Sequence, residues 1–203
     1  MTNDAIFYLG GSPCAGKSSV AEILAARYGL TYIRLDDKLA DHIQASSPDT
    51  QPTLASLKNA TCDEIWLIPS VQQTRREIQF YLEEFPLHQK DIAKATGPLL
   101  LEGAALLPCL VAPLINTMHS ALYMVPTASF QREHYSQRPW VADVLRDCSD
   151  PAKAFENWMR RDERFARWVR HTAHVHGLQT IIVDGSRDIE THARLAAQHF
   201  GLM

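Results

Sequence analysis

Cysteine is scarce in this sequence, and neither sign of charge is in large excess. The four cysteines among 203 residues lie about forty positions or more apart and form no Cys-x-x-Cys pair. This spacing excludes a zinc knuckle and a disulfide-built miniprotein. With 20 Lys and Arg against 23 Asp and Glu, the formal charge of −3 provides no general attraction to nucleic acid. We therefore expect no nucleic-acid partner, and reduced thiols at Cys14, Cys62, Cys109 and Cys148.

Long hydrophobic runs are also lacking. The best candidate for a membrane span, residues 98–115, contains Glu102 and the interior prolines Pro108 and Pro113. We expect a strand followed by a short helix there, and no membrane partner. The first residues lack the basic start and the long apolar run of a secretory signal, so the expected compartment is the cytoplasm.

The composition is that of an ordinary globular α/β domain. Hydrophobic residues make up 46% and charged residues 21%, which excludes a disordered tail or a collagen-like repeat. Short apolar runs alternate with segments of helical periodicity, and this alternation predicts a parallel sheet covered on both faces. The expected strands are residues 5–9, 31–35, 99–101, 121–125 and 180–183. The expected helices include residues 17–28, 38–44, 70–85, 150–176 and 189–200.

The middle of the chain is expected to be helical. Residues 54–96 show helical patterns and no strand pattern. The long helix over residues 70–85 is expected to stop there, because Pro86 follows it. We interpret residues 38–96 as a helical insertion within a single domain of residues 1–203.

The strongest functional signal is a glycine-rich loop between the first expected strand and the first helix. Residues 11–18 fit the pattern Gly-x-x-x-x-Gly-Lys-Ser/Thr at every defined position. The backbone N–H groups of such a loop, with the positive end of the helix behind them, cradle phosphate groups. The residues expected to bind a nucleotide here are Gly11, Ser12, Pro13, Cys14, Ala15, Gly16, Lys17, Ser18 and Ser19.

Two side chains of this loop are expected to carry chemistry. Lys17 would meet the β- and γ-phosphates as a positive charge. The Ser18 hydroxyl would bind a magnesium ion that bridges the same oxygens. Cys14 would contribute its backbone more than its sulfur. The expected cofactors are therefore ATP and Mg²⁺.

Other motifs narrow the class of nucleotide-binding protein. A guanine-specific switch carries Asn-Lys-x-Asp after a later strand, and this sequence contains no such motif. In a motor or transport ATPase the third strand usually ends in Asp, whereas residues 99–101 run into Glu102. The sequence therefore favours neither a GTPase nor a motor.

The order of features along the chain is informative in itself. After the phosphate loop come a second strand ending in Asp36 and Asp37, the helical insertion, a third strand ending in Glu102, and arginines after the fourth strand. In this order the features resemble the P-loop small-molecule kinases, a group that holds shikimate, gluconate, adenylylsulfate and nucleoside kinases and chloramphenicol phosphotransferase. The resemblance implies a three-layer P-loop NTPase fold with five parallel strands in the order 2-3-1-4-5. It also implies a helical lid over residues 127–176.

The resemblance implies roles for three carboxylates. Asp37 matches the acidic residue that these kinases place after the second strand to contact or deprotonate the acceptor hydroxyl. Asp36 could instead reach the magnesium ion through water, and either aspartate could simply cap the following helix. Glu102 matches the acidic residue at the end of the third strand, where it could hold a magnesium-bound water or bind the acceptor. A structural ion pair is the alternative for Glu102.

Arginines and a second loop complete the implied site. Arg138 and Arg132 lie in the lid segment, where such kinases clamp the transferring phosphoryl group. Gly185 and Ser186 resemble the loop that touches adenine through backbone groups, or form an ordinary turn. Arg75 in the insertion could meet an anionic acceptor, or is a solvated side chain.

Two other groups on the expected helix over residues 150–176 are interpreted as structural. His171, His174 and His176 lie at the helix end, but no Cys or carboxylate completes a zinc set near them. A solvated, charged helix face is expected at Arg160, Arg161, Arg164 and Arg167.

The leading hypothesis is an ATP-dependent kinase that moves the γ-phosphoryl group to a hydroxyl or phosphate of a small molecule. The alternative is a nucleotide-binding regulatory protein with little turnover, which would use the insertion to bind a partner. The acceptor is left unassigned because specificity depends on the shape of a pocket.

Overall fold

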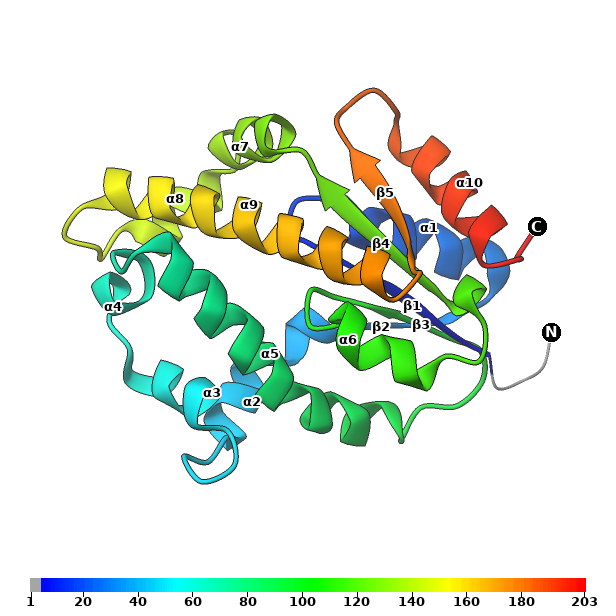
Figure 1. The fold of residues 1–203 in the computed structure, drawn as a ribbon, viewed down its shortest axis with the longest axis horizontal. Helices are drawn as coiled ribbons and strands as arrows, with labels where there is room; N and C mark the ends of the chain where they lie inside the picture. The colour runs from blue at the N-terminus through cyan, green and yellow to red at the C-terminus, as the bar shows by residue number, and fades with distance from the viewer. Residues whose placement is uncertain (1–4) are drawn as a thin grey trace.

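One parallel sheet of five strands organises the protein (Figure 1). The computed structural model describes residues 5–203. Neighbouring strands are all parallel and follow the order β2-β3-β1-β4-β5, which confirms the predicted topology. The strands are β1 (Ile6–Gly11), β2 (Thr31–Arg34), β3 (Leu99–Glu102), β4 (Ala121–Pro126) and β5 (Gln179–Val183).

Helices cover both faces of the sheet, and the three layers are visible in Figure 1. The covering helices are α1 (Lys17–Tyr28), α5 (Ser70–Ile92), α6 (Pro108–Val111), α9 (Pro151–Val175) and α10 (Ile189–His199). Along β1, Phe7 and Leu9 pack on the side of α1 and α10. Tyr8 points the opposite way and packs with residues of α5, α6 and α9. Successive side chains of a strand alternate between faces, so β1 contributes to both halves of the core.

The remaining helices lie mainly in two long connections of the sheet. We call the chain between β2 and β3 the insertion, and the chain between β4 and β5 the lid segment. No helix within residues 5–203 has the length and apolarity that crossing a membrane requires. Before α5, the insertion contains η1 (Leu35–Lys38), α2 (Leu39–Ala45), α3 (Pro52–Ser56), η2 (Leu57–Asn59) and α4 (Cys62–Trp66). Before α9, the lid segment contains α7 (Ala128–Ser136) and α8 (Pro139–Leu145). Two short helices, η3 (Ala112–Leu114) and η4 (Met118–Ser120), follow α6.

Helix α5 does not end where the sequence predicts. It continues through Pro86 to Ile92. A proline inside a helix removes one backbone hydrogen bond and crowds the preceding turn. Phe85 and His88, on either side of Pro86, are both buried, so packing of this face maintains the helix across the proline.

Cys62 and Cys148 form a disulfide, which corrects the expectation of four reduced thiols. Cys62 begins α4 and Cys148 follows α8, and their Cα atoms lie 4.9 Å apart. The other two cysteines, Cys14 and Cys109, are free. Because the paired cysteines are separated by 86 residues, only the packing of the insertion against the lid segment brings them together. The bond therefore links these two segments covalently.

Reduction of this disulfide is expected to lower the free energy of unfolding by about 2–4 kcal/mol, because the bond restricts the unfolded chain. Urea unfolding with and without dithiothreitol measures the difference. The double variant Cys62→Ser/Cys148→Ser is the control, and reductant should not change its stability. Equal stability of the oxidised and reduced wild-type protein would contradict the prediction.

Candidate nucleotide-binding site

The loop between β1 and α1 adopts backbone conformations that favour glycine. Gly11 has a φ of 138°, and a Cβ at this position would collide with the carbonyl group of Met124 on β4. Gly16, immediately before α1, has a φ of 75°. Cys14 also has a positive φ, 65°, which residues with a Cβ rarely adopt. Backbone strain of this kind concentrates at functional sites, and here it lies in the middle of the predicted phosphate loop.

Lys17 is buried at the base of this loop. Its Nζ donates to the Ser12 carbonyl oxygen at 2.9 Å and lies 3.9 Å from Oε1 of Glu102. The side chains of Lys17 and Glu102 are only 5% and 1% exposed. The Ser12 hydroxyl is buried as well, and among residues 5–203 it has no hydrogen-bond partner. A loop that presents an unpaired buried hydroxyl and a buried ammonium group is suited to an anionic ligand.

Glu102 is held by a tyrosine that the sequence did not reveal as a site residue. The hydroxyl of Tyr32 donates to Oε2 of Glu102 at 2.9 Å. Burial raises the pKa of Glu102, while Lys17 and hydrogen bonds from Tyr32 and Ser18 oppose this shift. Tyr32 becomes recognisable once β2 and β3 are paired, because its ring and the Glu102 side chain then extend from the same face of neighbouring strands.

The oxygen donors around Lys17 fit a magnesium ion. Mg²⁺ prefers hard oxygen ligands and keeps water and nucleotide phosphates among them, so few protein ligands are needed. Ser18 and Asp36 both lie close enough to Glu102 to influence its pKa, which Ser18 lowers and Asp36 raises. The structure thus brings together Ser18, Asp36 and Glu102, the three residues that the sequence suggested for the metal.

The two aspartates after β2 have different surroundings. Oδ1 of Asp36 accepts a hydrogen bond from the Ala104 N–H at 3.1 Å, just beyond β3. Gly103 makes room for it, since a Cβ there would lie 2.8 Å from this oxygen. Asp37 is 66% exposed, and its Oδ1 lies 3.5 Å from Nε of Arg34. The structure therefore places Asp36, and not Asp37, against the end of β3.

A cavity of about 600 Å³ opens beside the loop. Its walls include Cys14 and Gly16 of the loop, Arg138 of the lid segment and Gly185 after β5. A Cβ at Gly185 would lie 3.2 Å from the ring of Phe130, so this wall is closely packed. The volume is within the range of small-molecule and cofactor sites. The fold thus gathers three separate segments of the predicted site around one cavity.

The structure also shows the surroundings of Cys14, in the loop after β1, and of Ser186, in the turn after β5. Burial raises the pKa of the Cys14 thiol, although the charge of Arg138 opposes this, so the thiol stays protonated. Ser186 does not line the cavity beside the loop. Its N–H and hydroxyl donate to Oδ1 of Asp184 at 2.9 and 2.6 Å, which makes a tight turn after β5.

The two lid arginines lie in different places. Arg138 lines the cavity, with its guanidinium 5.1 Å from the ring centre of Tyr135 and 5.7 Å from that of Trp140. Arg132 donates to both carboxylate oxygens of Glu156, at 2.6 and 3.3 Å, and so joins α7 to α9. Of the two, the structure brings Arg138 to the phosphate loop and holds Arg132 in an ion pair outside the cavity.

Comparison with known proteins identifies the fold. No family model and no curated protein matches this chain. The crystal structure of shikimate kinase from Bacteroides thetaiotaomicron matches it with a TM-score of 0.50 at 13% sequence identity, over 96% of this chain and 97% of that one. This chain has the same fold as that protein. Shikimate kinase from Acinetobacter baumannii, solved in complex with shikimate, has a TM-score of 0.49 at 17% identity, over 96% of this chain and 91% of that one.

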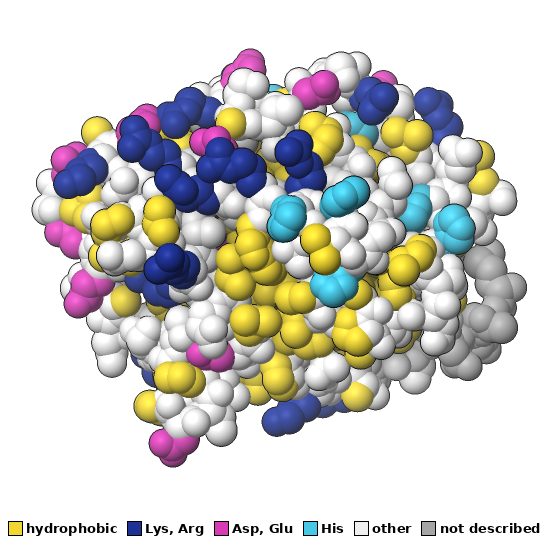
Figure 2. Space-filling model, viewed as in Figure 1, with side chains coloured by type: hydrophobic (Ala, Val, Ile, Leu, Met, Phe, Trp, Pro, Cys, Tyr) yellow, Lys and Arg dark blue, Asp and Glu magenta, His cyan; other side chains and the backbone are white. Residues whose placement is uncertain are grey.

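In this fold, the outer face of α9 is strongly basic. Figure 2 shows Lys and Arg side chains gathered over the part of the view where α9 runs in Figure 1. Arg160, Arg164 and Arg167 are exposed, as expected of a solvated helix face. Arg75 of α5 is exposed too. Arg161 is the exception, because its side chain is only 14% exposed.

Arg161 forms a buried ion-pair cluster that sequence reasoning missed. Its Nε lies 3.2 Å from Oε2 of Glu77, and a terminal guanidinium nitrogen lies 2.6 Å from Oδ1 of Asp162. Glu77 and Asp162 are buried, and the guanidinium lies 5.0 Å from the ring centre of Trp66. Burial works against the charge of Arg161, but the two carboxylates outweigh it and raise the pKa of the guanidinium. This cluster ties α5 to α9.

The sequence pattern of α5 indicates that charged residues of this helix are buried, but it does not identify their partners. Charged residues that interrupt an otherwise inward-facing helical stripe indicate buried polar contacts. Their partners are on another helix, so the stripe alone does not identify them. Positions three or four residues apart along the buried side of α5 are Ser70, Thr74, Glu77, Tyr81, Glu84 and His88.

Glu77 is expected to make stability depend on pH. Burial raises its pKa from the ordinary 4.5 to about 7, although Arg161 opposes the shift. The folded protein then binds this proton more tightly than the unfolded chain, so the contribution of Glu77 to stability is fully present below pH 4.5 and is lost as the pH rises through 7. Urea unfolding across this range should show that Glu77→Gln removes this part of the slope. Glu22→Gln, at an exposed position of α1, should retain it, and an unchanged slope in Glu77→Gln would rule out the assignment.

Proposed function

We propose that this protein is an ATP- and magnesium-dependent phosphotransferase that moves the γ-phosphoryl group to a hydroxyl or phosphate of a small molecule. The observation that carries the proposal is the buried Lys17–Glu102 pair beneath a glycine loop that opens into a cavity of about 600 Å³. A P-loop kinase fold supports the same class of reaction. The proposed partner is a small-molecule acceptor, with no nucleic acid and no membrane involved.

The residues around the loop can share the work of phosphoryl transfer. Ser18 and Glu102 would hold a magnesium ion bound with the nucleotide, which would supply positive charge to the phosphates. Lys17 would place a fixed positive charge beside the terminal phosphates, with Glu102 keeping its ammonium in position. Arg138, on the cavity wall, would donate to the transferring group from the lid side. These groups act by positioning and by electrostatic stabilisation, which is what phosphoryl transfer requires.

We propose Asp36 as the carboxylate that takes the proton of the acceptor hydroxyl. Its contact with the Ala104 N–H fixes it beside the Lys17–Glu102 pair, whereas Asp37 faces Arg34 at the surface. Asp36→Asn is expected to lower kcat about 10²-fold, because general-base assistance is lost. The amide still has an oxygen that can accept from Ala104, so the fold should be kept.

Asp37→Asn is the matched control for this prediction, and its kcat should change little. Steady-state kinetics with saturating ATP and acceptor distinguish the two variants. A loss in Asp37→Asn as large as that in Asp36→Asn would overturn the choice of Asp36.

The function is tested in two steps. Calorimetry should show one nonhydrolysable ATP analogue bound per chain when magnesium is present, and a lack of binding would refute the proposal. A thermal-shift screen of metabolites and drugs on the nucleotide-bound protein should then identify an acceptor by its further stabilisation. Nucleotide binding without transfer to any acceptor, together with a copurifying protein partner, would instead favour a regulatory protein.

We propose different roles for the two segments around the site. Within one domain of residues 1–203, residues 38–96 would bind the acceptor and residues 127–176 would cover the nucleotide. The Cys62–Cys148 bond joins these segments, so they would move together while it is intact.

A cytoplasmic location stays a prediction, and the Cys62–Cys148 disulfide weighs against it because cytosolic thiols are kept reduced.

A further inference from the structure

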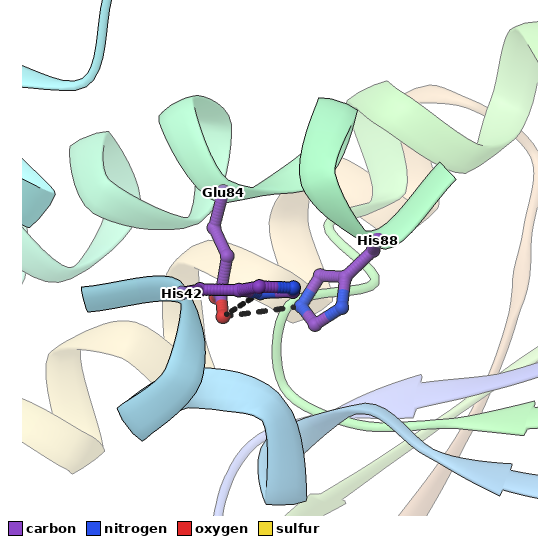
Figure 3. Close-up of side chains that lie close together, drawn as sticks. All are labelled: His42, Glu84 and His88. Carbon is purple, nitrogen blue, oxygen red and sulfur yellow. Dashed lines mark hydrogen bonds and ion pairs between the residues drawn. The ribbon is translucent and has the colours of Figure 1, made fainter. Parts of the chain in front are cut away.

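Three buried side chains of the insertion converge on one point (Figure 3). Glu84 and His88 lie one turn apart on α5, and His42 reaches them from α2. Glu84 and His88 are each 1% exposed, and His42 is 7% exposed. One ligand atom from each lies within 4.8 Å of the other two, and no other trio of His, Cys, Asp or Glu in residues 5–203 is gathered so closely.

His42 lies between two carboxylates. Its Nδ1 lies 3.0 Å from Oε1 of Glu84, and its Nε2 lies 3.2 Å from Oδ2 of Asp91. A protonated imidazole would donate to both carboxylates, whereas a neutral imidazole has one N–H donor and one acceptor nitrogen and can donate to only one of them. If Nε2–H donates to Asp91, the lone pair of Nδ1 faces a carboxylate oxygen. A cation between Nδ1 and Glu84 would turn this repulsion into attraction.

His88 provides an independent observation. Both of its ring nitrogens are buried and have no hydrogen-bond partner within the described part of the chain. Nε2 lies 3.3 Å from Oε1 of Glu84, but the two groups do not have the geometry of a hydrogen bond. Buried polar atoms are normally paired, so an unpaired imidazole directed at a carboxylate indicates a missing partner.

The donor set suits a transition-metal ion, and its two nitrogen–oxygen distances are close to those that such an ion requires. Four ligands at about 2.0–2.1 Å around a tetrahedral Zn²⁺ are about 3.3–3.4 Å apart. The Glu84 oxygen lies 3.0 Å from the His42 nitrogen and 3.3 Å from the His88 nitrogen. Two imidazoles and one carboxylate form a common protein site for zinc, whereas Mg²⁺ prefers oxygen ligands alone.

We propose that His42, Glu84 and His88 bind one Zn²⁺ ion. Asp91 is the outer partner of this site, because its hydrogen bond to Nε2 of His42 directs Nδ1 to the metal and makes the imidazole a stronger ligand. Three protein ligands leave a fourth tetrahedral position, which a water molecule would fill.

The ion would link two helices of the insertion, α2 and α5. Helix α2 follows η1 directly, and η1 carries Asp36 and Asp37. A metal shared between α2 and α5 would fix α2 to the long helix of the insertion, and with it the turn that presents the two aspartates. The three ligands are not residues of the glycine-rich loop, so Zn²⁺ uptake can be measured without nucleotide.

The test uses the full chain, stripped of metal with a chelator and titrated with ZnCl₂ in excess MgCl₂. Calorimetry should show one Zn²⁺ per chain, and Zn²⁺ should raise the Tm. Co²⁺ added in its place should give the visible absorption of a four-coordinate ion with nitrogen ligands. A folded wild-type protein that takes up no Zn²⁺, or loses it to Mg²⁺, would overturn the proposal.

Variants separate this site from adventitious binding. His88→Gln removes a ligand, and Asp91→Asn alters only the outer partner, whose side chain is 33% exposed and whose substitution leaves the buried trio in place. Each should weaken Zn²⁺ binding at least tenfold. His171→Gln, an exposed histidine of α9, is the control and should bind as the wild type does. Equal affinity in Asp91→Asn, His88→Gln and wild type would place the metal elsewhere and refute the assignment.

Discussion

Replacing Lys17 with methionine is expected to lower kcat for phosphoryl transfer about 10³-fold. The lysine supplies a fixed charge at the base of the loop, 2.9 Å from the Ser12 carbonyl and 3.9 Å from Glu102. Methionine fills nearly the same volume without charge, so the buried position stays packed. Glu102 then loses its cationic neighbour, and its pKa should rise further. Loss of the ammonium group removes positive charge from the place where the transferring group would become more negative.

Kinetics with a saturating acceptor measures this loss, and circular dichroism and the Tm show that Lys17→Met is folded. Lys90→Met, at an exposed position of α5, is the matched control and should keep wild-type turnover. Unchanged turnover in Lys17→Met would exclude the proposed role of the loop. Loss of turnover in both variants would indicate a general effect of removing lysine charge.

The second large effect is expected on stability. Arg161→Met should lower the free energy of unfolding by about 3–5 kcal/mol, because it leaves two buried carboxylates without their cation. Glu77 and Asp162 are 3% and 0% exposed, and both pair with this guanidinium. The stacking of the guanidinium over Trp66 is also lost. The effect should be largest above pH 7, where Glu77 is ionised in the folded protein.

Arg164→Met on the same helix is the control for this prediction. Arg164 is exposed, and replacing a surface residue of this kind usually changes stability by less than about 0.5 kcal/mol. Chemical unfolding at pH 8 compares the two variants directly. A loss in Arg161→Met no larger than that in Arg164→Met would show that the buried cluster does not need its cation.

Local patterns in the sequence determined the sheet and the phosphate loop. Buried strands appear as continuous apolar runs, and the glycines at Gly11 and Gly16 mark a turn that the structure reproduces with positive φ at both positions. The ranges 17–28 and 189–200 agree with α1 and α10 almost residue by residue. These features were predictable because each depends on residues close together in the chain.

Tertiary structure decided the features that join distant segments. Nothing in the spacing of four cysteines pairs Cys62 with Cys148, and the helix-breaking tendency of Pro86 is overridden by the burial of α5 around it. Helix packing also directs Arg161 inward while its neighbours on α9 face solvent.

The same holds for the carboxylates and histidines. Asp36 and Asp37 are equivalent as neighbours in the sequence, and only the end of β3 distinguishes them. His42 meets Glu84 because α2 packs beside α5. The periodicity of a sequence shows which face of a helix or strand is buried. The partner of each buried side chain depends on how whole elements pack against one another, and this packing exists only in the folded chain.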